Sequence, residues 1–398
     1  MMKSFIKSWL EIQLRKFRLT KEIKSLSIMR NIDINREINV IDNKLHNNKD
    51  KKLLIAFIIP GMPQGSGGHT SILRLGTGLA EYGHDVHYIS YIPENLEVMV
   101  KNAEHNLKGF KGKICGPKAL NSMQIDIGIA TLWISAYYLW NLSNISYKAY
   151  FIQDYEPDFY PAGAVRVFAE NTYRMGYHMI SLGTWNKKRI EKEIGINVDS
   201  IVFPYEPTEY GIEHGWESKF QEKRIIKLCA YLKGAEKRGG VFLLMCLEEL
   251  YKALLEREIK LEISLFGDDS RLKYPISVPY VNLGKLNKEN LRTLYNKSDF
   301  GVVFSYTNIS LVPLEMMACG CPVVEVADGS FKDFFDPDCA ILVNSFPQDF
   351  VRKIIYYIDN PDERKHMAER ALKGLQKKTW KEAVCQFHEL LIKSYNNN

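Results

Sequence analysis

The amino-acid sequence predicts an α/β protein made of two doubly wound, Rossmann-like domains that face a central cleft. Short, largely apolar strand-like runs alternate with helical segments, the pattern of a mainly parallel sheet covered on both faces. The alternation stops once, in a segment rich in proline, glycine and charge over residues 203–223, and then starts again. A chain of 398 residues with 46% hydrophobic content is long enough for two domains, each with its own core.

The first domain is expected over residues 51–203, after an N-terminal extension of residues 1–50. The sequence LLIAFII predicts a buried strand, and it is followed by a glycine-rich turn and a helix with Ile72, Leu75 and Leu79 on one face. Further strands of this domain are expected at DVHYIS, IDIGIA, KAYFIQ and HMISLG. This order of strand, loop and helix is typical of a parallel sheet.

The second domain is expected over residues 224–378, after a linker of residues 204–223. Strands are expected at RIIKLCAYL, LEISLFG, YVNLG, FGVVFS and PVVEV. Amphipathic helices are expected at residues 241–257 and 288–297. A last helix within residues 379–398 is expected to cross back to the first domain.

The positive charge of the chain is concentrated at its N-terminus. Residues 1–30 contain eight Lys or Arg and two Glu, a local net charge of +6 that equals the net charge of the whole chain. Phe5, Trp9 and Ile12 recur at helical spacing among the basic residues. The segment predicts either an interfacial helix attracted to anionic lipid or an amphipathic helix docked on protein. A nucleic-acid partner is not expected, because no basic groove or stacking motif accompanies the segment elsewhere.

Cysteine usage and hydropathy indicate the compartment. The seven cysteines form no CxxC pair, so neither a disulfide framework nor a zinc site is expected. No apolar run approaches the roughly 18–20 residues that a membrane span needs. We therefore expect a cytoplasmic protein, with peripheral contact to the inner face of the cell membrane through residues 1–30 as one alternative.

Two loops that follow expected strands carry ligand-binding chemistry. In PGMPQGSGGHTS, Gly67 and Gly68 let the backbone approach a ligand and His69 opens the helix, so the loop binds an anion or sugar or is merely a tight turn. It has neither the Walker ending nor the dinucleotide fingerprint. In YLKGAEKRGG, the cations Lys233, Lys237 and Arg238 suit a diphosphate, and a solvated charge run is the alternative.

A third stretch, SYTNISLVPLEMMACGCPVV, places the lone carboxylate of Glu315 in an apolar helical run. A buried charge costs several kcal/mol by order of magnitude unless it is paired, so Glu315 needs a partner, and a ligand hydroxyl is one. Ser310 stands at the expected N-cap, where the helix N-terminus can hold phosphate oxygens.

Acidic residues at two other places have different expected roles. Asp154 and Glu156 follow the AYFIQ strand, and we expect them either near a transferred sugar or acceptor or as caps of an ordinary loop. Asp336 and Asp338 match the Asp-x-Asp string of metal-dependent transferases, but they lie late in the chain between short apolar stretches, which favours a turn. No metal site is expected.

The order of these motifs over roughly residues 53–375 resembles the GT-B glycosyltransferases of the retaining sucrose-synthase-like superfamily, family 4. The sequences AYFIQDYEPDFYPAG and YLKGAEKRGG resemble more specifically the bacterial WsaF-type rhamnosyltransferases, which use dTDP-L-rhamnose to extend cell-surface glycans. The catalytic candidates are Asp154, Glu156 and His69, and a purely structural role is the equal alternative for His69. The resemblance implies donor contacts by Gly67, Gly68, Lys233, Arg238, Ser310, Leu311 and Glu315, and Gly267 and Asn308 complete the expected donor-binding set.

The sequence departs from the superfamily at one position. The superfamily commonly has two glutamates eight positions apart, and Thr307 stands where the first is expected. This puts the transfer of donor-sugar recognition in doubt. Enzymes of the resembled class need no metal and no obligatory protein base, because the departing diphosphate can take the acceptor proton.

The expected function is a retaining transfer of L-rhamnose from dTDP-L-rhamnose to a growing cell-surface glycan, without a metal cofactor. The expected partners are the nucleotide-sugar donor and a glycan acceptor, and a lipid-linked acceptor would explain the basic N-terminus. Two alternatives stay open. One is a GT-B transferase that uses a UDP- or GDP-sugar, and the other is a non-catalytic module that binds a glycan or a nucleotide sugar.

Overall fold

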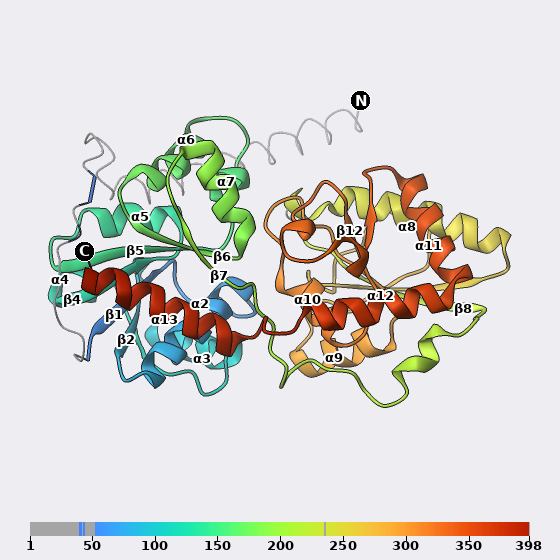
Figure 1. The fold of residues 1–398 in the computed structure, drawn as a ribbon, viewed down its shortest axis with the longest axis horizontal. Helices are drawn as coiled ribbons and strands as arrows, with labels where there is room; N and C mark the ends of the chain where they lie inside the picture. Colours follow the sequence, from blue (N-terminus) through green and yellow to red (C-terminus); the bar gives the residue numbers. More distant parts are fainter. Residues whose placement is uncertain (1–39, 42, 44–51, 235, 398) are drawn as a thin grey trace, which may run out of the picture.

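The computed structural model describes residues 40–41, 43, 52–234 and 236–397. Two α/β lobes lie side by side in this part of the chain (Figure 1), and each lobe is built on one parallel sheet. The predicted fold class is therefore confirmed. The basic segment of residues 1–30 lies outside the described residues, so the two interpretations of that segment stay open.

The described residues of the first lobe form a seven-stranded sheet with the order β3-β2-β1-β4-β5-β6-β7. Its strand order reverses between β1 and β4, which makes a crevice at the carboxyl ends of these strands. The strands are β1 (Leu54–Ile59), β2 (Asp85–Ser90), β3 (Lys113–Cys115), β4 (Ile125–Ala130), β5 (Ile145–Ile152), β6 (His178–Leu182) and β7 (Asp199–Ile201). The helices are α2 (Gly67–Glu81), α3 (Leu96–Asn106), α4 (Ala119–Ser122), α5 (Trp133–Trp140), α6 (Ala164–Asn171) and α7 (Thr184–Ile194).

The described residues of the second lobe form a six-stranded sheet with the order β10-β9-β8-β11-β12-β13. Its strand order reverses between β8 and β11 in the same way. The strands are β8 (Ile225–Tyr231), β9 (Lys260–Phe266), β10 (Val281–Asn282), β11 (Phe300–Val302), β12 (Val323–Val326) and β13 (Ile341–Val343). The helices are α8 (Gly240–Glu256), α9 (Lys288–Lys297), α10 (Leu311–Ala318), α11 (Pro347–Asp359) and α12 (Pro361–Gly374).

The last helix, α13 (Trp380–Asn397), returns to the first lobe, where it packs against α2, β6 and β7. In Figure 1 it runs in red along that lobe, so the chain crosses between the lobes twice. The two crossing segments hydrogen-bond to each other, because the Tyr205 N–H donates to the Lys378 carbonyl (2.9 Å) and the Trp380 N–H to the Tyr205 carbonyl (3.3 Å). A double connection of this kind joins the lobes at one edge and leaves a crevice between them.

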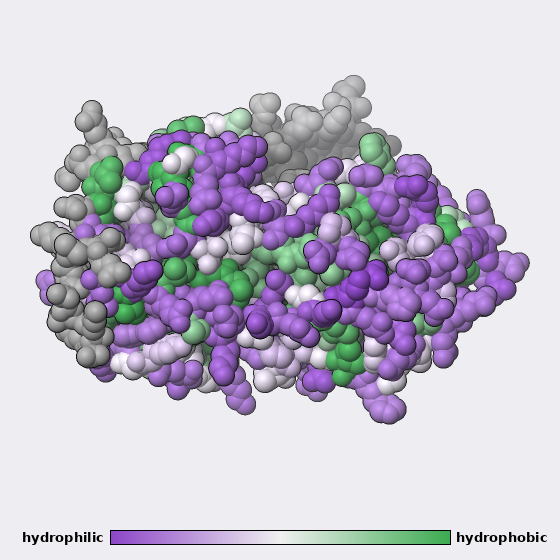
Figure 2. All heavy atoms as spheres, in the orientation of Figure 1, coloured by the Kyte–Doolittle hydropathy of each residue, from purple (hydrophilic) through white to green (hydrophobic). Residues whose placement is uncertain are grey.

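The face of the molecule shown in Figure 2 is mostly hydrophilic, and apolar residues show there only as small separate patches. Among the described residues, no helix combines the length and the apolar character needed to cross a membrane. The apolar side chains instead fill the cores on the two faces of each sheet.

Candidate active site

A cavity of about 530 Å³ lies between the two lobes, where loops at the carboxyl ends of both sheets meet. This volume falls within the usual range for small-molecule sites, roughly 300–1,000 Å³. Most of the residues predicted from the sequence for catalysis or donor binding line it, although they come from distant parts of the chain. These are Gly67, Gly68, Asp154, Glu156, Lys233, Arg238, Gly267, Ser310, Leu311 and Glu315.

The first turn of α2 is open to this cavity. Ser66 is the N-cap of the helix, and its hydroxyl oxygen accepts a hydrogen bond from the His69 N–H at 3.5 Å. A Cβ at Gly67 would meet no atom within 4 Å, and one at Gly68 would only touch the Gln153 side chain at 3.5 Å. Backbone N–H groups at a helix N-terminus attract anions, and no side chain at Gly67 or Gly68 covers them, so this turn can face a phosphate or a carboxylate.

His69 does not line the cavity, but it supports the loop that does. Its Nδ1 lies 2.8 Å from the Ser66 hydroxyl oxygen. Burial lowers the pKa of His69 to about 4, so the imidazole is neutral at physiological pH. A group with so low a pKa is a weak base at neutral pH, and its contact with Ser66 indicates a role in shaping the loop.

The cationic loop after β8 brings Lys233, Lys237 and Arg238 to the cavity wall. The Arg238 side chain is largely buried, and its Nη1 donates to the Ser305 hydroxyl (2.9 Å) and to the Asn308 carbonyl (3.3 Å). Burial lowers the pKa of both Lys233 and Lys237. Three cations from one loop create a field that favours a dianionic ligand.

Asp154 makes four hydrogen bonds, three of which join the two lobes. Its Oδ1 accepts from the N–H groups of Tyr155 (2.9 Å) and Asn308 (3.1 Å), and its Oδ2 accepts from the Thr307 hydroxyl (3.0 Å). The Lys237 ammonium lies 2.6 Å from the same Oδ2. The carboxylate is therefore fully engaged in this arrangement. Thr307, which replaces the expected first glutamate, contacts a carboxylate that the opposite lobe supplies.

Asn308 was predicted to bind the donor, and it does not line the cavity. Its side chain is 1% exposed and its Nδ2 donates to the carbonyls of Gln153 (2.7 Å) and Leu182 (3.1 Å), both in the first lobe. Together with Asp154, it holds the lobes in the arrangement that forms the cavity walls.

Glu156 is buried at the end of the cavity that belongs to the first lobe. Its Oε2 accepts a hydrogen bond of 2.5 Å from the Trp133 N–H, at the first residue of α5. Burial raises the pKa of Glu156 to about 8, although the Trp133 N–H opposes that shift. Most Glu156 carboxyl groups are therefore protonated at pH 7, a state in which the group can donate a hydrogen bond.

The N-terminus of α10 reaches the cavity from the second lobe. Ser310 is its N-cap, as predicted, but the hydroxyl makes no capping hydrogen bond. Its Oγ is buried and has no hydrogen-bond partner within the described part of the chain. Ser310 and Leu311 both line the cavity, so two helix N-termini, one from each lobe, end at the same space.

Glu315 lies one turn into α10, also on the cavity wall. Burial raises its pKa to about 7, the charge of Glu209 adds to the shift, and a hydrogen bond from the Tyr210 hydroxyl opposes it. Tyr210, in the linker, is thus one partner of the lone carboxylate. The remaining oxygen lone pairs of Glu315 are available to a ligand hydroxyl.

One end of the cavity is aromatic. Phe266 lies between Tyr231 and Tyr295, with ring centroids at 5.5 Å and 5.7 Å, and all three line the cavity. Flat apolar walls of this kind suit a planar ring. Gly267 has a φ of +113°, and a Cβ there would lie 2.5 Å from the Tyr231 ring, so only glycine fits at this position. Sequence patterns did not identify these aromatic residues because they belong to ordinary buried strands and a helix.

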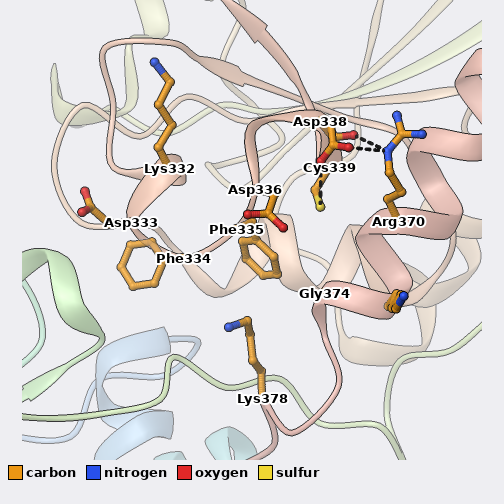
Figure 3. A pocket seen from close by; sticks show the side chains of 11 residues that line it. Lys332, Asp333, Phe334, Phe335, Asp336, Asp338, Cys339, Arg370, Gly374 and Lys378 are labelled. Atoms are coloured by element: carbon orange, nitrogen blue, oxygen red, sulfur yellow. Dashed lines mark hydrogen bonds and ion pairs between the residues drawn. The ribbon is translucent and has the colours of Figure 1, made fainter.

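The Asp-x-Asp string lies at a different pocket (Figure 3), none of whose lining residues lines the interlobe cavity. Asp338 points toward Arg370, whose Nε lies 2.9 Å from its carboxylate. Asp336 is the N-cap of a short 3-10 turn over Pro337–Cys339, and Asp338 lies within that turn. Within the described residues, no cluster of three or more His, Cys, Asp or Glu side chains could hold a metal ion.

Residues 243–389 match the protein family described as "Glycosyl transferase-like". The O-antigen biosynthesis protein RfbC of Myxococcus xanthus is 29% identical over 215 residues. That match covers 50% of this chain and 15% of RfbC, so the chain spans only a small part of the length of that relative.

Solved structures resemble this chain over most of its length. Sucrose-phosphate synthase from Thermosynechococcus elongatus has a TM-score of 0.65 at 14% identity, covering 87% of this chain and 100% of that one. HepE from Anabaena, in complex with UDP-glucose, has a TM-score of 0.66 at 12% identity, covering 86% and 100%. TarM has a TM-score of 0.67 at 10% identity, covering 86% and 99%. The chain therefore has the GT-B fold of glycosyltransferases, and its residues 243–389 match the glycosyl transferase-like family.

Proposed function

We propose that the protein is a glycosyltransferase that moves a sugar from a nucleotide donor to a growing cell-surface glycan. The observation that supports this most strongly is the meeting of cations, two helix N-termini and the carboxylate of Glu315 at one interlobe cavity. A nucleotide sugar carries the complementary groups, which are a diphosphate, sugar hydroxyls and a planar base. The similarity of half the chain to an O-antigen biosynthesis protein favours a surface glycan as the product.

In the proposed complex, each wall of the cavity binds one part of the donor. Lys233 and Arg238, with the N-terminus of α10 at Ser310 and Leu311, hold the diphosphate. The first turn of α2 faces the same phosphates from the other lobe. Glu315 accepts hydrogen bonds from the hydroxyls of the nucleotide's sugar ring. The base lies against the aromatic end of the cavity.

The proposed reaction depends on positioning and electrostatics. Cations and helix N–H groups stabilise the negative charge that grows on the leaving diphosphate, and that diphosphate can accept the proton of the attacking hydroxyl. The sugar would be transferred with retention. Glu156, largely protonated, can donate a hydrogen bond to the transferred sugar or the acceptor. Asp154 would act by holding the lobes closed on the substrates, and His69 by shaping the first loop.

The proposed donor is dTDP-L-rhamnose, on the basis of the AYFIQDYEPDFYPAG and YLKGAEKRGG segments. A UDP-sugar is the second candidate, because the structurally similar HepE was solved in complex with UDP-glucose. Thr307 in place of the expected glutamate argues for a donor-sugar environment unlike that of the general superfamily.

A binding titration with purified protein tests the donor. We expect metal-free binding of dTDP and dTDP-L-rhamnose that is tighter than binding of UDP, GDP and their common sugar conjugates, with little change on adding magnesium. Preference for UDP or GDP would keep the proposed reaction and replace the sugar donor. Failure of all three nucleotides and their conjugates to bind would overturn the proposed enzyme in favour of a glycan-binding module.

Membrane contact through residues 1–30 is a separate part of the proposal, since a lipid-linked acceptor would lie at the membrane surface. We expect the full chain to float with liposomes that contain anionic lipid. A chain that lacks residues 1–30 should float less, and both chains should stay unbound with neutral liposomes. Equal flotation of the two chains would remove this role.

A further inference from the structure

Glu325 is a buried carboxylate that the proposed donor contacts do not use. It lies within β12, an inner strand of the second sheet, and is 0% exposed. A charge at such a place is costly, often several kcal/mol, unless hydrogen bonds compensate it. The surrounding PVVEV pattern is otherwise apolar, so sheet packing alone does not call for a carboxylate here.

The hydrogen bonds of Glu325 lead toward the interlobe cavity. Its Oε2 accepts from the backbone N–H groups of Ser305 (2.9 Å) and Val326 (3.2 Å). Ser305, also fully buried, accepts a hydrogen bond at its hydroxyl oxygen from the Arg238 Nη1 at 2.9 Å. A guanidinium only donates, so the single hydroxyl proton of Ser305 is left to donate elsewhere, and the Glu325 Oε1 is buried without a hydrogen-bond partner among the described residues.

Arg238, Ser305 and Glu325 thus form a hydrogen-bonded series that ends at the cavity wall, in which Arg238 contacts the Ser305 hydroxyl and Glu325 contacts the Ser305 N–H. Arg238 lines the cavity, whereas Ser305 and Glu325 do not. The positive charge of Arg238 in turn favours the ionised form of Glu325. Hydrogen bonds in such a series polarise one another, and a buried carboxylate at one end makes the serine oxygen a better acceptor for the guanidinium.

We infer that Glu325 is a positioning residue for the donor's diphosphate, because it orients the Ser305 hydroxyl and through it holds the Arg238 guanidinium at the cavity. This inference rests on the proposed function, since it needs a phosphate-bearing ligand at that wall. Glu325 touches no substrate in this arrangement and acts only through Arg238. Its role should therefore appear in the affinity for phosphates and not in the affinity for the rest of the nucleotide.

The test compares Glu325→Gln with the wild-type protein in titrations against UDP, dTDP and GDP and against the nucleosides uridine, thymidine and guanosine. Glutamine keeps an oxygen for the two backbone N–H groups and removes the charge. We expect about a tenfold loss of affinity for the nucleoside diphosphate that the wild-type protein binds, the size of one weakened charge-assisted hydrogen bond. Affinity for its nucleoside should not change. In an Arg238→Ala background, Glu325→Gln should cause no further loss.

Two more variants complete the design. Ser305→Ala removes the hydroxyl between Arg238 and Glu325 and should weaken diphosphate binding as Glu325→Gln does. It therefore still tests the inference if thermal unfolding shows that Glu325→Gln folds poorly. Glu262→Gln removes a charge from β9, where it pairs with Lys260 at 2.6 Å, and should change nothing. Unchanged diphosphate affinity in both Glu325→Gln and Ser305→Ala, or equal losses for diphosphate and nucleoside, would overturn the positioning role alone. A wild-type protein that binds none of the nucleotides would overturn the proposed function as well.

Discussion

Replacing Arg238 with alanine is expected to lower the rate of sugar transfer at least about a hundredfold, the usual size of losing one preorganised donor to a developing negative charge. Arg238 is largely buried and its guanidinium is held by Ser305 and Asn308, so little reorganisation is needed when a diphosphate binds. Lys233 is less buried than Arg238, so Lys233→Ala should cost less. The measurement is release of nucleoside diphosphate from the sugar nucleotide that the wild-type protein binds.

A matched control separates the loss of a binding group from the loss of any arginine. Arg352 is exposed on α11 and pairs with Asp349, so Arg352→Ala should leave the rate unchanged. The same pair of variants distinguishes an enzyme from a binding module. In a module that binds glycans without catalysis, Arg238→Ala would leave glycan affinity intact and no turnover would be found in the wild-type protein. Wild-type turnover that survives Arg238→Ala would contradict the proposed role of this residue.

The central strands of both sheets and the edge strand β10, expected at YVNLG, could be predicted from the sequence, whereas the edge strands β3, β7 and β13 could not. The run LLIAFII is almost wholly buried and apolar throughout, and LEISLFG alternates buried apolar residues with partly exposed polar ones, so both patterns can be recognised without a structure. The strands β3, β7 and β13 have three residues each and were not predicted. Strands this short form because a neighbouring strand already offers hydrogen-bonding groups, and local sequence does not record that neighbour.

The candidate site follows the same division. The motif loops could be found from glycines, cations and a lone carboxylate, because their composition is unusual at the end of a strand. The contacts of Asp154 with Thr307 and Lys237 could not be predicted from the sequence, since they join residues on opposite lobes. Lys237 was recognised as one of three cations, but only the folded chain shows that it pairs with Asp154. The hydrogen bonds from Asn308 to the carbonyls of Gln153 and Leu182 on the first lobe could not be predicted either, for the same reason.

Replacing Glu315 with glutamine is expected to weaken binding of the sugar nucleotide about tenfold at pH 8, since a carboxylate accepts hydrogen bonds from hydroxyls more strongly than an amide does. Burial raises the pKa of Glu315 to about 7 in the protein alone. Hydroxyl donors favour the ionised form, so wild-type affinity should fall about tenfold between pH 8 and pH 6, as the ionised fraction drops. Glu315→Gln should remove that part of the pH dependence.

The choice of ligand matters for this measurement. A nucleoside diphosphate has a terminal phosphate that itself titrates near pH 6, whereas a sugar nucleotide does not, so the sugar nucleotide is the proper ligand. Glu156 and Glu325 also titrate near neutral pH, with pKa values raised by burial to about 8 and about 7. They are present in both proteins, and the difference between wild type and Glu315→Gln therefore isolates Glu315. An identical pH profile in the two proteins would exclude the proposed contact.

Glu315→Gln should not lower the stability of the fold, although it weakens binding of the sugar nucleotide. A raised pKa means that the folded protein holds the Glu315 proton more tightly than the unfolded chain does, so this residue costs stability as the pH rises from about 4.5 toward about 7. Glu315→Gln should therefore have a thermal midpoint at pH 8 equal to or above that of the wild type. A carboxylate that destabilises the fold and strengthens ligand binding has its role in ligand binding and not in stability. A variant that loses both stability and affinity would instead assign Glu315 to the packing of α10.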